Sequence, residues 1–323
     1  MVKAIRVHQT GGPETLVMED VDLPAPAADE VQIRQRAIGV NYIDIYRRTG
    51  AYPADCPFIP GHEGAGDVIA VGENVKSFKV GQRVAYVGAL GGYAQARNIA
   101  ADSVIRLPKS FSYAQGAVMM LKGLTAQYLL RRTFKVKKGH RVLVHAGAGG
   151  VGQILCQWAN GLGAKVIATV GSPDKAKIAE RAGAKHTILY REENFVERVR
   201  DLTKGKLCDV VYDGVGRATF PNSLDCLKPF GMFVSFGSAS GPIAAFDIGL
   251  LALKGSLYAT RPSLFTHIAR RRDYEEMVDD LVDAMKQGLV SVGEPERFPL
   301  ADAAKVHAAL ESRTTSGSMV LIP

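Results

Sequence analysis

Cysteine is scarce in this chain of 323 residues, and long apolar runs are absent. The four cysteines, Cys56, Cys156, Cys208 and Cys226, are far apart and form no Cys-X-X-Cys pair. This argues against a disulfide framework and a closed zinc site, and reduced, partly buried thiols are expected. No run reaches the roughly 18 apolar residues of a membrane span, and residues 1–12 contain no signal-like apolar core. A cytoplasmic protein without a membrane segment is the default expectation.

Acidic residues are also in deficit, since 32 Asp and Glu stand against 40 Lys and Arg, which gives a formal net charge of +8. This charge favours an anionic partner, either a phosphate-bearing cofactor or nucleic acid, and does not choose between them. Hydrophobic residues make up 47% of the chain and charged residues 22%, as in ordinary globular proteins. Because 323 residues exceed what one hydrophobic core usually supports, two domains are expected.

Two patterns of secondary structure follow each other along the chain. Short β-type runs separated by Pro and Gly fill the first hundred or so residues and predict an antiparallel, partly barrel-like domain. Residues 112–132 predict a linking helix. After Lys138, helices alternate with six apolar strands: RVLVHA, KVIATV, HTILY, DVVYDGV, GMFVSFG and GSLYAT. This alternation predicts an α/β domain with a doubly wound parallel sheet. Beyond Thr260, two amphipathic helices and a closing strand, GSMVLIP, are expected to return to the first domain.

A glycine-rich turn follows the first of these strands. Gly147, Gly149 and Gly152 form GxGxxG between a strand and a helix whose first turn contains Gly150 and Val151. The first glycine allows a tight turn, the second lets the backbone approach a pyrophosphate, and the third lets helix and strand pack closely. The free N–H groups at the start of the helix then face the anion. The motif predicts a dinucleotide site, and a glycine-bearing loop without a ligand is the alternative.

An acid is missing where an NAD site would place one, about twenty residues beyond the glycines. The segment VGSPDK stands there, so that Ser172 and Lys175 follow the strand end at Val170. A hydroxyl and an ammonium group suit a 2′-phosphate, which favours NADPH. Asp174 is the exception, and we interpret it as a helix-N-terminal acid. Lys175 as a solvated surface lysine is the alternative.

Seven stretches spread along the chain carry a further signal: GVNYIDIYRRTGAY, PGHEGAGDVIAVGENVKSFKVGQRV, LKGLTA, AGAGGVGQ, VVYDGVG, VSFGSASGP and GSLYATRPSL. Together they resemble the zinc-free NADPH:quinone oxidoreductases of the medium-chain dehydrogenase/reductase superfamily, the group that includes zeta-crystallin. The resemblance implies a GroES-like catalytic domain at 1–123 and 263–323, with a Rossmann NADPH-binding domain at 124–262. It also implies a homodimer or homotetramer, with MFVSFGSASGP as the pairing strand at the edge of the Rossmann sheet.

The resemblance also bears on metal binding. In zinc alcohol dehydrogenases, a motif like GHE at 61–63 supplies a histidine ligand. Those enzymes need a cysteine where Asn41 stands, and a third ligand is absent from VMMLKG. One imidazole cannot hold a catalytic zinc that wants three protein ligands, so no metal is predicted. His62 is expected to be a hydrogen-bonded pocket or structural histidine, and a vestigial metal site is the alternative.

The site residues are carried over by the same resemblance. It places four of them as catalytic residues in the cleft near the nicotinamide: Asn41, Tyr46, Tyr52 and Thr125. It adds to the cofactor site Phe236 and Gly237, and around the 2′-phosphate Tyr190 and Arg313, whose guanidinium suits phosphate oxygens. A quinone accepts reducing equivalents readily, so the site needs mainly orientation and an apolar slot. Packing roles for the two tyrosines, and a turn role for Asn41, are the alternatives.

Two other functions compete with quinone reduction. An NADPH-dependent alkenal or enone double-bond reductase would share the fold, the cofactor and the lack of zinc, although NYIDIYRRTGAY favours a quinone. A nucleic-acid-binding or structural protein is suggested by RRTFKVKKGHR at 131–141 and by RRR at 270–272. Such runs are usually solvated faces, and no RNP-like or helix-turn-helix signature accompanies them, so nucleic acid is not the expected partner.

Overall fold

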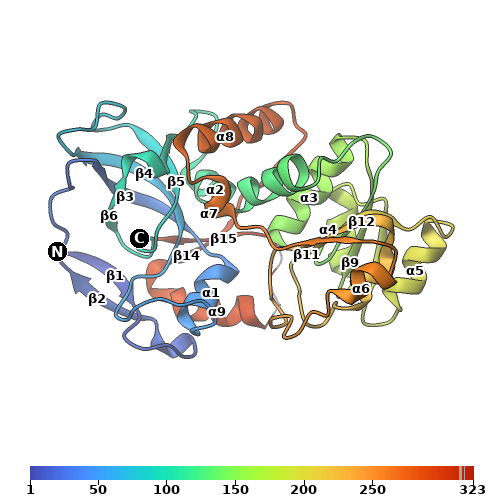
Figure 1. Ribbon diagram of the computed structural model, residues 1–323. Coiled ribbons are helices and arrows are strands. Elements are labelled where there is room, and N and C mark those ends of the chain that lie inside the picture. Colours follow the sequence, from blue (N-terminus) through green and yellow to red (C-terminus); the bar gives the residue numbers. More distant parts are fainter. Residues whose placement is uncertain (313–314, 316) are drawn as a thin grey trace. The chain divides into compact units, whose positions relative to one another are not determined.

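The structure is a computed structural model that describes residues 1–312, 315 and 317–323 (Figure 1). The chain divides into two compact units: Met1–Leu121 with Val292–Pro323, and Lys122–Ser291. The closing strand β15 (Met319–Ile322) pairs antiparallel with β3 (Glu30–Gly39). This pairing places the closing strand in the first unit.

The first unit is built on a mainly antiparallel sheet. Its strand order is β14 (Glu296–Pro299), β15, β3, β4 (Glu63–Val71), β5 (Arg83–Val87) and β7 (Val104–Arg106), and β6 (Ala96–Ala100) pairs with β3. A separate hairpin consists of β1 (Val2–Arg6) and β2 (Val17–Val21). Successive residues of a strand face opposite sides, so Val31 and Ile33 of β3 are buried while Arg34 and Arg36 are exposed.

Two short helices of the first unit lie next to its strands in the sequence. Helix α1 (Tyr42–Arg48) follows β3, and α9 (Ala303–Glu311) precedes β15. The guanidinium of Arg48 is fully buried, and its Nη2 donates to Glu311 Oε1 over 2.7 Å. A charge in the interior is stable only with such a partner, so this ion pair holds α1 to the C-terminal segment.

The second unit contains the predicted parallel sheet. Its strand order is β10 (His186–Leu189), β9 (Lys165–Val170), β8 (Arg141–Val144), β11 (Cys208–Asp213), β12 (Leu227–Ser235) and β13 (Tyr258–Thr260). Every neighbouring pair runs parallel. All six strands predicted from the sequence are therefore confirmed, and the strand order reverses at β8, as in a doubly wound sheet.

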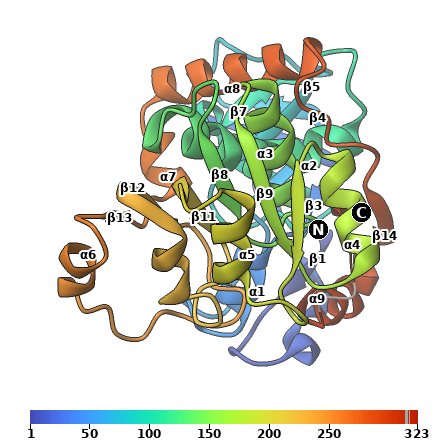
Figure 2. The ribbon, with the colours of Figure 1, turned by 90° about the vertical axis from the view of Figure 1, so that its right-hand side faces the viewer.

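Helices cover both faces of this sheet (Figure 2). Helix α3 (Gly150–Gly161) and α4 (Pro173–Arg181) contact each other and β9, so they share a face. On the opposite face, Val199 of α5 (Phe195–Leu202) packs with Leu143 and Ile167. Because both faces are covered, the strands are apolar throughout instead of alternating.

The return to the first unit begins later than predicted. Helix α2 (Tyr113–Tyr128) continues into a π-helical turn (Leu129–Thr133). Helix α6 (Gly249–Leu253) lies between β12 and β13, and α7 (Leu264–His267) and α8 (Arg271–Lys286) follow β13. A Cβ at Gly123 of α2 would lie 2.6 Å from the Leu281 side chain of α8, and Gln127 donates to Asp280 over 2.9 Å. These contacts place residues 263–291 in the second unit, whereas the sequence pattern had assigned them to the first.

The predicted pairing strand is also placed differently. MFVSFGSASGP begins within β12, which lies between β11 and β13 and is therefore an interior strand. The edge prediction for this segment was wrong because the short strand after it, β13, adds a further neighbour to the sheet. Among the described residues, no helix is both long and apolar enough to cross a lipid bilayer.

Candidate active site

The glycine turn joins β8 to α3 as the motif predicts, but the structural roles of its glycines differ from those expected. The left-handed backbone belongs to Ala146, with φ of 55°. A Cβ on Gly147 would lie 2.5 Å from Ala168 Cβ of β9, and one on Gly152 would lie 2.2 Å from the Ala146 carbonyl oxygen. Both glycines are therefore needed for close packing, and Gly147 is not the residue that turns the chain.

The start of α3 has the features of an anion site. Gly149 is its N-cap and donates through its own N–H to the Ala146 carbonyl over 2.9 Å. A Cβ on Gly149 would meet only that carbonyl, at 3.2 Å. The N–H groups of Gly150, Val151 and Gly152 lie in the first helical turn, where a helix supplies no acceptor. This combination of an open backbone and unsatisfied donors fits a pyrophosphate.

The end of β9 brings together three predicted residues. Ser172 is the N-cap of α4, and its Oγ accepts from the Lys175 backbone N–H over 3.4 Å. Tyr190 donates through its backbone N–H to Val170 over 3.2 Å, and its hydroxyl would lie 3.0 Å from a Cβ at Gly171. A hydroxyl, a phenol and a lysine therefore gather beside one strand end. Predicted Arg313 lies outside the described residues.

Asp174 does not contribute an acid to this group. Its side chain is 89% exposed and lies 3.1 Å from Lys177 Nζ, so it pairs along the outer face of α4. A carboxylate in the first turn also interacts favourably with the helix dipole. The interpretation of Asp174 as a helix-N-terminal acid agrees with this position.

Phe236 and Gly237 follow β12 at the same edge of the sheet. The backbone N–H of Phe236 donates to the Asp213 carbonyl over 2.8 Å. A Cβ on Gly237 would lie 2.6 Å from the Gly214 carbonyl oxygen. The loops after β11 and β12 are therefore packed directly together at the carboxyl ends of the strands, where ligands of doubly wound sheets bind.

In the first unit, Asn41 is held from two sides. It is the N-cap of α1, and its backbone N–H donates to Asp44 Oδ2 over 2.8 Å. Its side-chain Nδ2 donates to Glu63 Oε1 over 2.8 Å, and Glu63 Oε2 accepts from the backbone N–H of Leu121 over 2.7 Å. Asn41 is 5% exposed and Glu63 is fully buried. The amide of Asn41 therefore has a fixed orientation.

Tyr46 and Tyr52 form an aromatic pair beside this helix. Both are half-buried, their ring centroids are 5.0 Å apart, and the Tyr52 N–H donates to the Tyr46 carbonyl over 2.9 Å. Tyr42 lies 6.2 Å from the Tyr46 ring, and the Arg47 guanidinium lies 5.9 Å from the Tyr52 ring. Thr125 belongs to the second unit, on α2, and is 7% exposed. The structure thus brings together three of the four predicted catalytic residues within one unit.

Comparison with known proteins places this geometry in a family. The model for the alcohol dehydrogenase GroES-like domain matches residues 27–109, and the model for zinc-binding dehydrogenases matches residues 150–283. A quinone oxidoreductase of Pseudomonas aeruginosa is 47% identical over the full length of both chains. The chain belongs to the quinone oxidoreductases of the medium-chain dehydrogenase/reductase superfamily. This confirms the predicted family and the predicted fold class, a Rossmann domain with a GroES-like domain.

Two further relatives of this family member bear on its chemistry. One similar solved structure is the crystal structure of Escherichia coli quinone oxidoreductase complexed with NADPH. Its sequence is 47% identical, and the match covers 99% of this chain and 100% of that chain with a TM-score of 0.97. A 2-haloacrylate reductase of a Burkholderia species is 43% identical over 100% of this chain and 99% of its own length.

Within this family frame, His62 is a buried, hydrogen-bonded residue. It is 3% exposed, and its Nδ1 lies 2.8 Å from the Gly88 carbonyl oxygen, which only accepts, so Nδ1 carries the proton. Burial lowers the pKa of His62 to about 4. The expectation of a hydrogen-bonded histidine is confirmed. Among the described residues, no group of three His, Cys, Asp or Glu side chains is placed to hold a metal ion. The absence of zinc stays a prediction.

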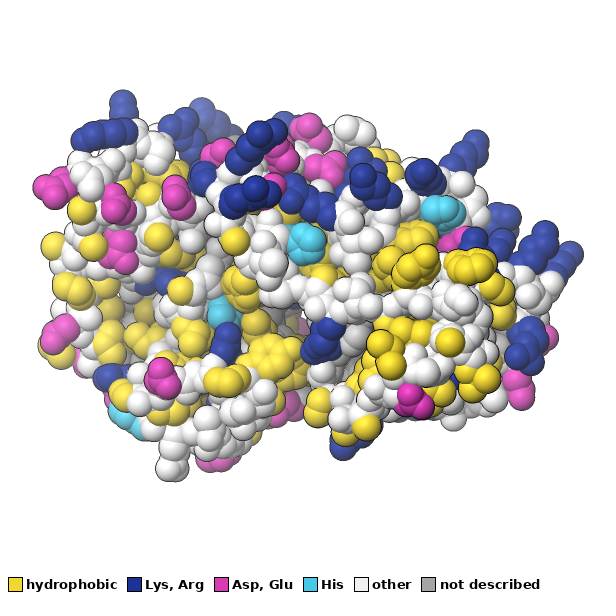
Figure 3. Space-filling model, in the orientation of Figure 1, with side chains coloured by type: hydrophobic (Ala, Val, Ile, Leu, Met, Phe, Trp, Pro, Cys, Tyr) yellow, Lys and Arg dark blue, Asp and Glu magenta, His cyan; other side chains and the backbone are white. Residues whose placement is uncertain are grey.

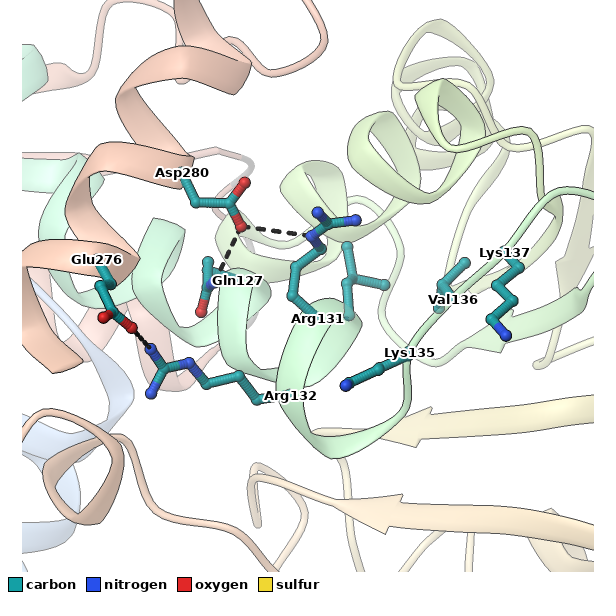
Figure 4. Close-up of a pocket in the computed structure, with 9 residues that line it drawn as sticks. Gln127, Arg131, Arg132, Lys135, Val136, Lys137, Glu276 and Asp280 are labelled. Carbon is teal, nitrogen blue, oxygen red and sulfur yellow. Dashed lines mark hydrogen bonds and ion pairs between the residues drawn. The ribbon is translucent and has the colours of Figure 1, made fainter.

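The basic run at 131–141 does not form a purely basic face. It lines a pocket of about 490 Å³ together with Glu276 and Asp280 of α8 (Figure 4). Asp280 Oδ2 accepts from Arg131 Nε over 3.3 Å, and Arg132 lies 3.5 Å from Glu276. Of the run at 270–272, Arg272 pairs with the same Glu276 over 2.8 Å. Carboxylates therefore pair with Arg131 and Arg132 of the first run and with Arg272 of the second, which counts against a purely basic nucleic-acid surface.

A buried polar network beneath the glycine turn was missed by sequence reasoning. Its five members lie at or after the strand ends of the second unit and are at most 9% exposed: His145, Thr169, Asp213, Thr219 and Ser223. Burial lowers the pKa of His145, and the nearby Asp213 charge opposes this. The available signal was a single polar residue at the end of each of three apolar strands, as in VLVH, VIAT and VVYD.

Proposed function

We propose that this protein is an NADPH-dependent quinone reductase that works without a metal. The observation that carries the proposal is the end of β9, where Ser172, Lys175 and Tyr190 lie and where an NAD site has an acid. Relatives that share its family at 47% identity over their full length are named quinone oxidoreductases, and one was crystallised with NADPH.

The residues of the second unit fit each part of the cofactor. The first-turn N–H groups of Gly150 to Gly152 would bind the pyrophosphate. The ammonium of Lys175 and the hydroxyls of Ser172 and Tyr190 would bind the 2′-phosphate. NADPH, when bound, supplies a hydride or electrons from its nicotinamide. The loop at Phe236 and Gly237, which is packed on the loop after β11, would support that reacting end.

The residues of the first unit fit a planar, apolar substrate. The half-buried rings of Tyr46 and Tyr52 offer flat apolar surface, which suits a quinone. Glu63 fixes the Asn41 amide, which is thereby oriented to position a quinone oxygen through a hydrogen bond. Within this unit, the hydroxyls of Tyr46 and Tyr52 are the candidates for protonating the reduced oxygen. A quinone needs no Lewis acid for this reaction, in agreement with the prediction of a metal-independent enzyme.

NADPH oxidation measured against a panel of quinones, enals and alcohols tests the proposal. We expect rapid turnover with quinones, a preference for NADPH over NADH, and no turnover with simple alcohols. A protein that oxidises alcohols, or that ignores every quinone in the panel, would contradict it.

A reductase of activated double bonds is the second candidate. The 43% identical 2-haloacrylate reductase supports this alternative. Such a substrate would use the same cofactor and the same aromatic pair, so the panel above decides between the two. A higher kcat/KM for enals or haloacrylates than for any quinone would favour the alternative.

We also propose that the protein is a cytoplasmic homodimer that pairs through β13, one of the two edge strands of the parallel sheet. Exposed apolar side chains gather near this edge, and Figure 3 shows them over β12 and α6. Tyr258 of β13 is 58% exposed, Leu253 of α6 is 81% exposed and Ile248 is 77% exposed. An exposed edge with apolar neighbours is a surface that proteins usually cover. Light scattering should give a dimer, or a homotetramer built from it, and Leu253→Glu with Tyr258→Arg should give a monomer.

A further inference from the structure

His145 connects the ends of three neighbouring parallel strands. It directly follows β8 and precedes the glycine turn, and its backbone N–H donates to the Tyr212 carbonyl over 3.0 Å. Its ring nitrogens reach in two directions: Nδ1 lies 2.9 Å from Thr169 Oγ1 in β9, and Nε2 lies 3.0 Å from Ser223 Oγ. The ring is 1% exposed, so both nitrogens make these contacts away from solvent.

The donors and acceptors of this group form one directed chain. The Ser223 hydroxyl lies 3.1 Å from Asp213 Oδ2 and 3.0 Å from the Thr219 carbonyl, and both of these only accept. Ser223 therefore donates its single proton there, and its oxygen accepts from His145 Nε2–H. In a neutral imidazole Nδ1 is then an acceptor, so the Thr169 hydroxyl donates to it. In this arrangement the Thr169 hydroxyl, the His145 N–H and the Ser223 hydroxyl each donate to an acceptor within the group.

Each end of the chain reaches a different part of the proposed cofactor site. The Thr169 carbonyl accepts from the Gly147 N–H over 3.1 Å, and β9 ends next to Ser172. At the other end, Asp213 Oδ1 accepts from the N–H groups of Val215 and Gly216 over 2.7 and 2.9 Å, which shapes the loop after β11. The loop containing Phe236 and Gly237 is packed on that loop. The hydrogen bond from His145 to Thr169, the Thr169 arm, therefore reaches the phosphate side of the site. The bonds that run through Ser223 and Asp213, the Ser223 arm, reach the nicotinamide side.

We propose that His145 is a positioning residue that sets the phosphate-binding strand end through Thr169 and the nicotinamide-side loop through Ser223 and Asp213. This inference rests on the proposed NADPH site. The two arms act on different constants. Loss of the Thr169 arm shifts the residues that hold the 2′-phosphate and so weakens cofactor binding. Loss of the Ser223 arm shifts the loop beside the reacting end and so lowers kcat.

Two single substitutions separate the arms. For Thr169→Val we expect the NADPH Kd, measured by the fluorescence of the reduced cofactor, to rise about three- to tenfold, with kcat nearly unchanged. For Ser223→Ala we expect kcat with a quinone to fall about three- to tenfold, with the NADPH Kd nearly unchanged. Thr169→Ser keeps the hydroxyl and should restore the wild-type Kd.

Thr203→Val is the matched control for these variants. Thr203 is 7% exposed in the same unit, but its hydroxyl donates to the Val199 carbonyl at the end of α5, in the segment that leads to the amino end of β11. This variant should lower the Tm and leave both Kd and kcat unchanged. In a His145→Leu background, Thr169→Val should have no further effect on Kd, because the Thr169 hydroxyl has already lost its partner. Ser223→Ala should have a smaller effect on kcat than in the wild type, because its link to His145 is already gone.

Several results would overturn the positioning role. Equal changes in Kd and kcat for both variants, effects on Tm alone, or the same kinetic losses in Thr203→Val would each show a merely structural network. If His145→Leu does not fold, the single variants still decide. A wild-type protein that binds no NADPH would overturn the proposed function itself. Wild-type binding and turnover with no separation between the arms would overturn only this inference.

Discussion

His307 in the first unit and His145 in the second are both buried and hydrogen-bonded, yet different kinds of structural element supply their hydrogen-bond partners. His307 Nε2 lies 2.9 Å from the Tyr93 hydroxyl, which donates to Asp44 Oδ2 over 3.2 Å. These residues belong to α9, to a loop and to α1, and Tyr93 and His307 are 214 positions apart. His145 instead contacts residues at the ends of neighbouring strands of one sheet.

The difference reflects how each unit is held together. The first unit has an irregular core in which distant segments meet, and Tyr93 packs there with Val306 of α9. Its polar network lies inside that core and joins segments that no strand pairing joins. The second unit is already ordered by continuous parallel pairing, so its polar network lies at the carboxyl ends of the strands and not inside the core. The first network therefore serves the fold, and the second is available to a ligand site.

The largest expected effect is on cofactor binding in the second unit. Replacing Lys175 with Ala should raise the KM for NADPH roughly ten- to a hundredfold, because hydrogen bonds to charged groups contribute about 1.5 to 3 kcal/mol. NADH, which lacks the 2′-phosphate, should be nearly unaffected, and kcat should change little because this end of the cofactor is bound equally in ground and transition states. Steady-state kinetics with both cofactors measure this. Arg313→Ala should behave in the same way.

Lys177→Ala is the control for that prediction. Lys177 lies on the same helix, is 70% exposed and pairs with Asp174. Its loss should leave both cofactors unaffected. Equal losses for NADH and NADPH in Lys175→Ala, or a wild type that prefers NADH, would contradict the assignment of the 2′-phosphate site.

The next effect concerns acid stability and the network of the first unit. Burial, with a contribution from Arg48, lowers the pKa of His307 to about 3 from 6.5. Between these values the unfolded state binds more protons, so the free energy of unfolding falls as pH decreases through this window and is fully retained above 6.5. The slope contributed by one such histidine is roughly 1.4 kcal/mol per pH unit.

Denaturant unfolding at several pH values measures this slope. His307→Leu should have a visibly shallower dependence in the same window, although it is less stable at neutral pH. An unchanged slope would show that other groups, such as His62 with its pKa of about 4, account for acid unfolding.

A smaller effect is expected on the substrate side of the first unit. Asn41→Ala removes the amide that Glu63 orients, and Tyr46→Ala and Tyr52→Ala remove the aromatic pair. Each should lower kcat/KM for quinone roughly three- to tenfold while NADPH affinity stays nearly intact. Asn98→Ala in β6, where the amide donates to the Pro24 carbonyl over 3.0 Å, is the control in the same unit. Variants that unfold or lose NADPH binding would reveal structural roles instead.

The smallest expected effect is that of metal removal. His62 donates to the Gly88 carbonyl, and the family resemblance places Asn41 where a zinc enzyme would have a cysteine. Chelator treatment should leave quinone reduction unchanged, and elemental analysis should find no stoichiometric zinc. Activity that is lost on chelation and restored by zinc would refute the metal-independent reading.

Much of the second unit could be predicted because its signals are local. Each apolar strand, the glycine turn and the missing acid after β9 are visible within a few residues of sequence, and all six strands were confirmed. The edge strand was wrong because its placement rested on the resemblance. GSLYAT was recognised as a strand, but its position outside β12 depends on strand order, which no local pattern shows. The sequence analysis placed the return of the chain to the first unit too early. The pattern of an amphipathic helix such as α8 shows that one face is buried but does not show which unit buries it.

The sequence by itself determined the alternation of strands and helices, the phosphate-binding turn and the family, because backbone propensity and short motifs are properties of neighbouring residues. Only the tertiary structure decided that Ala146, and not Gly147, takes the left-handed turn, and that α8 belongs with the parallel sheet. Only the tertiary structure joined His145 to Thr169, 24 positions away, and to Ser223, 78 positions away. Such contacts depend on which strands become neighbours, and strand order is set by the burial of the whole sheet rather than by any one segment.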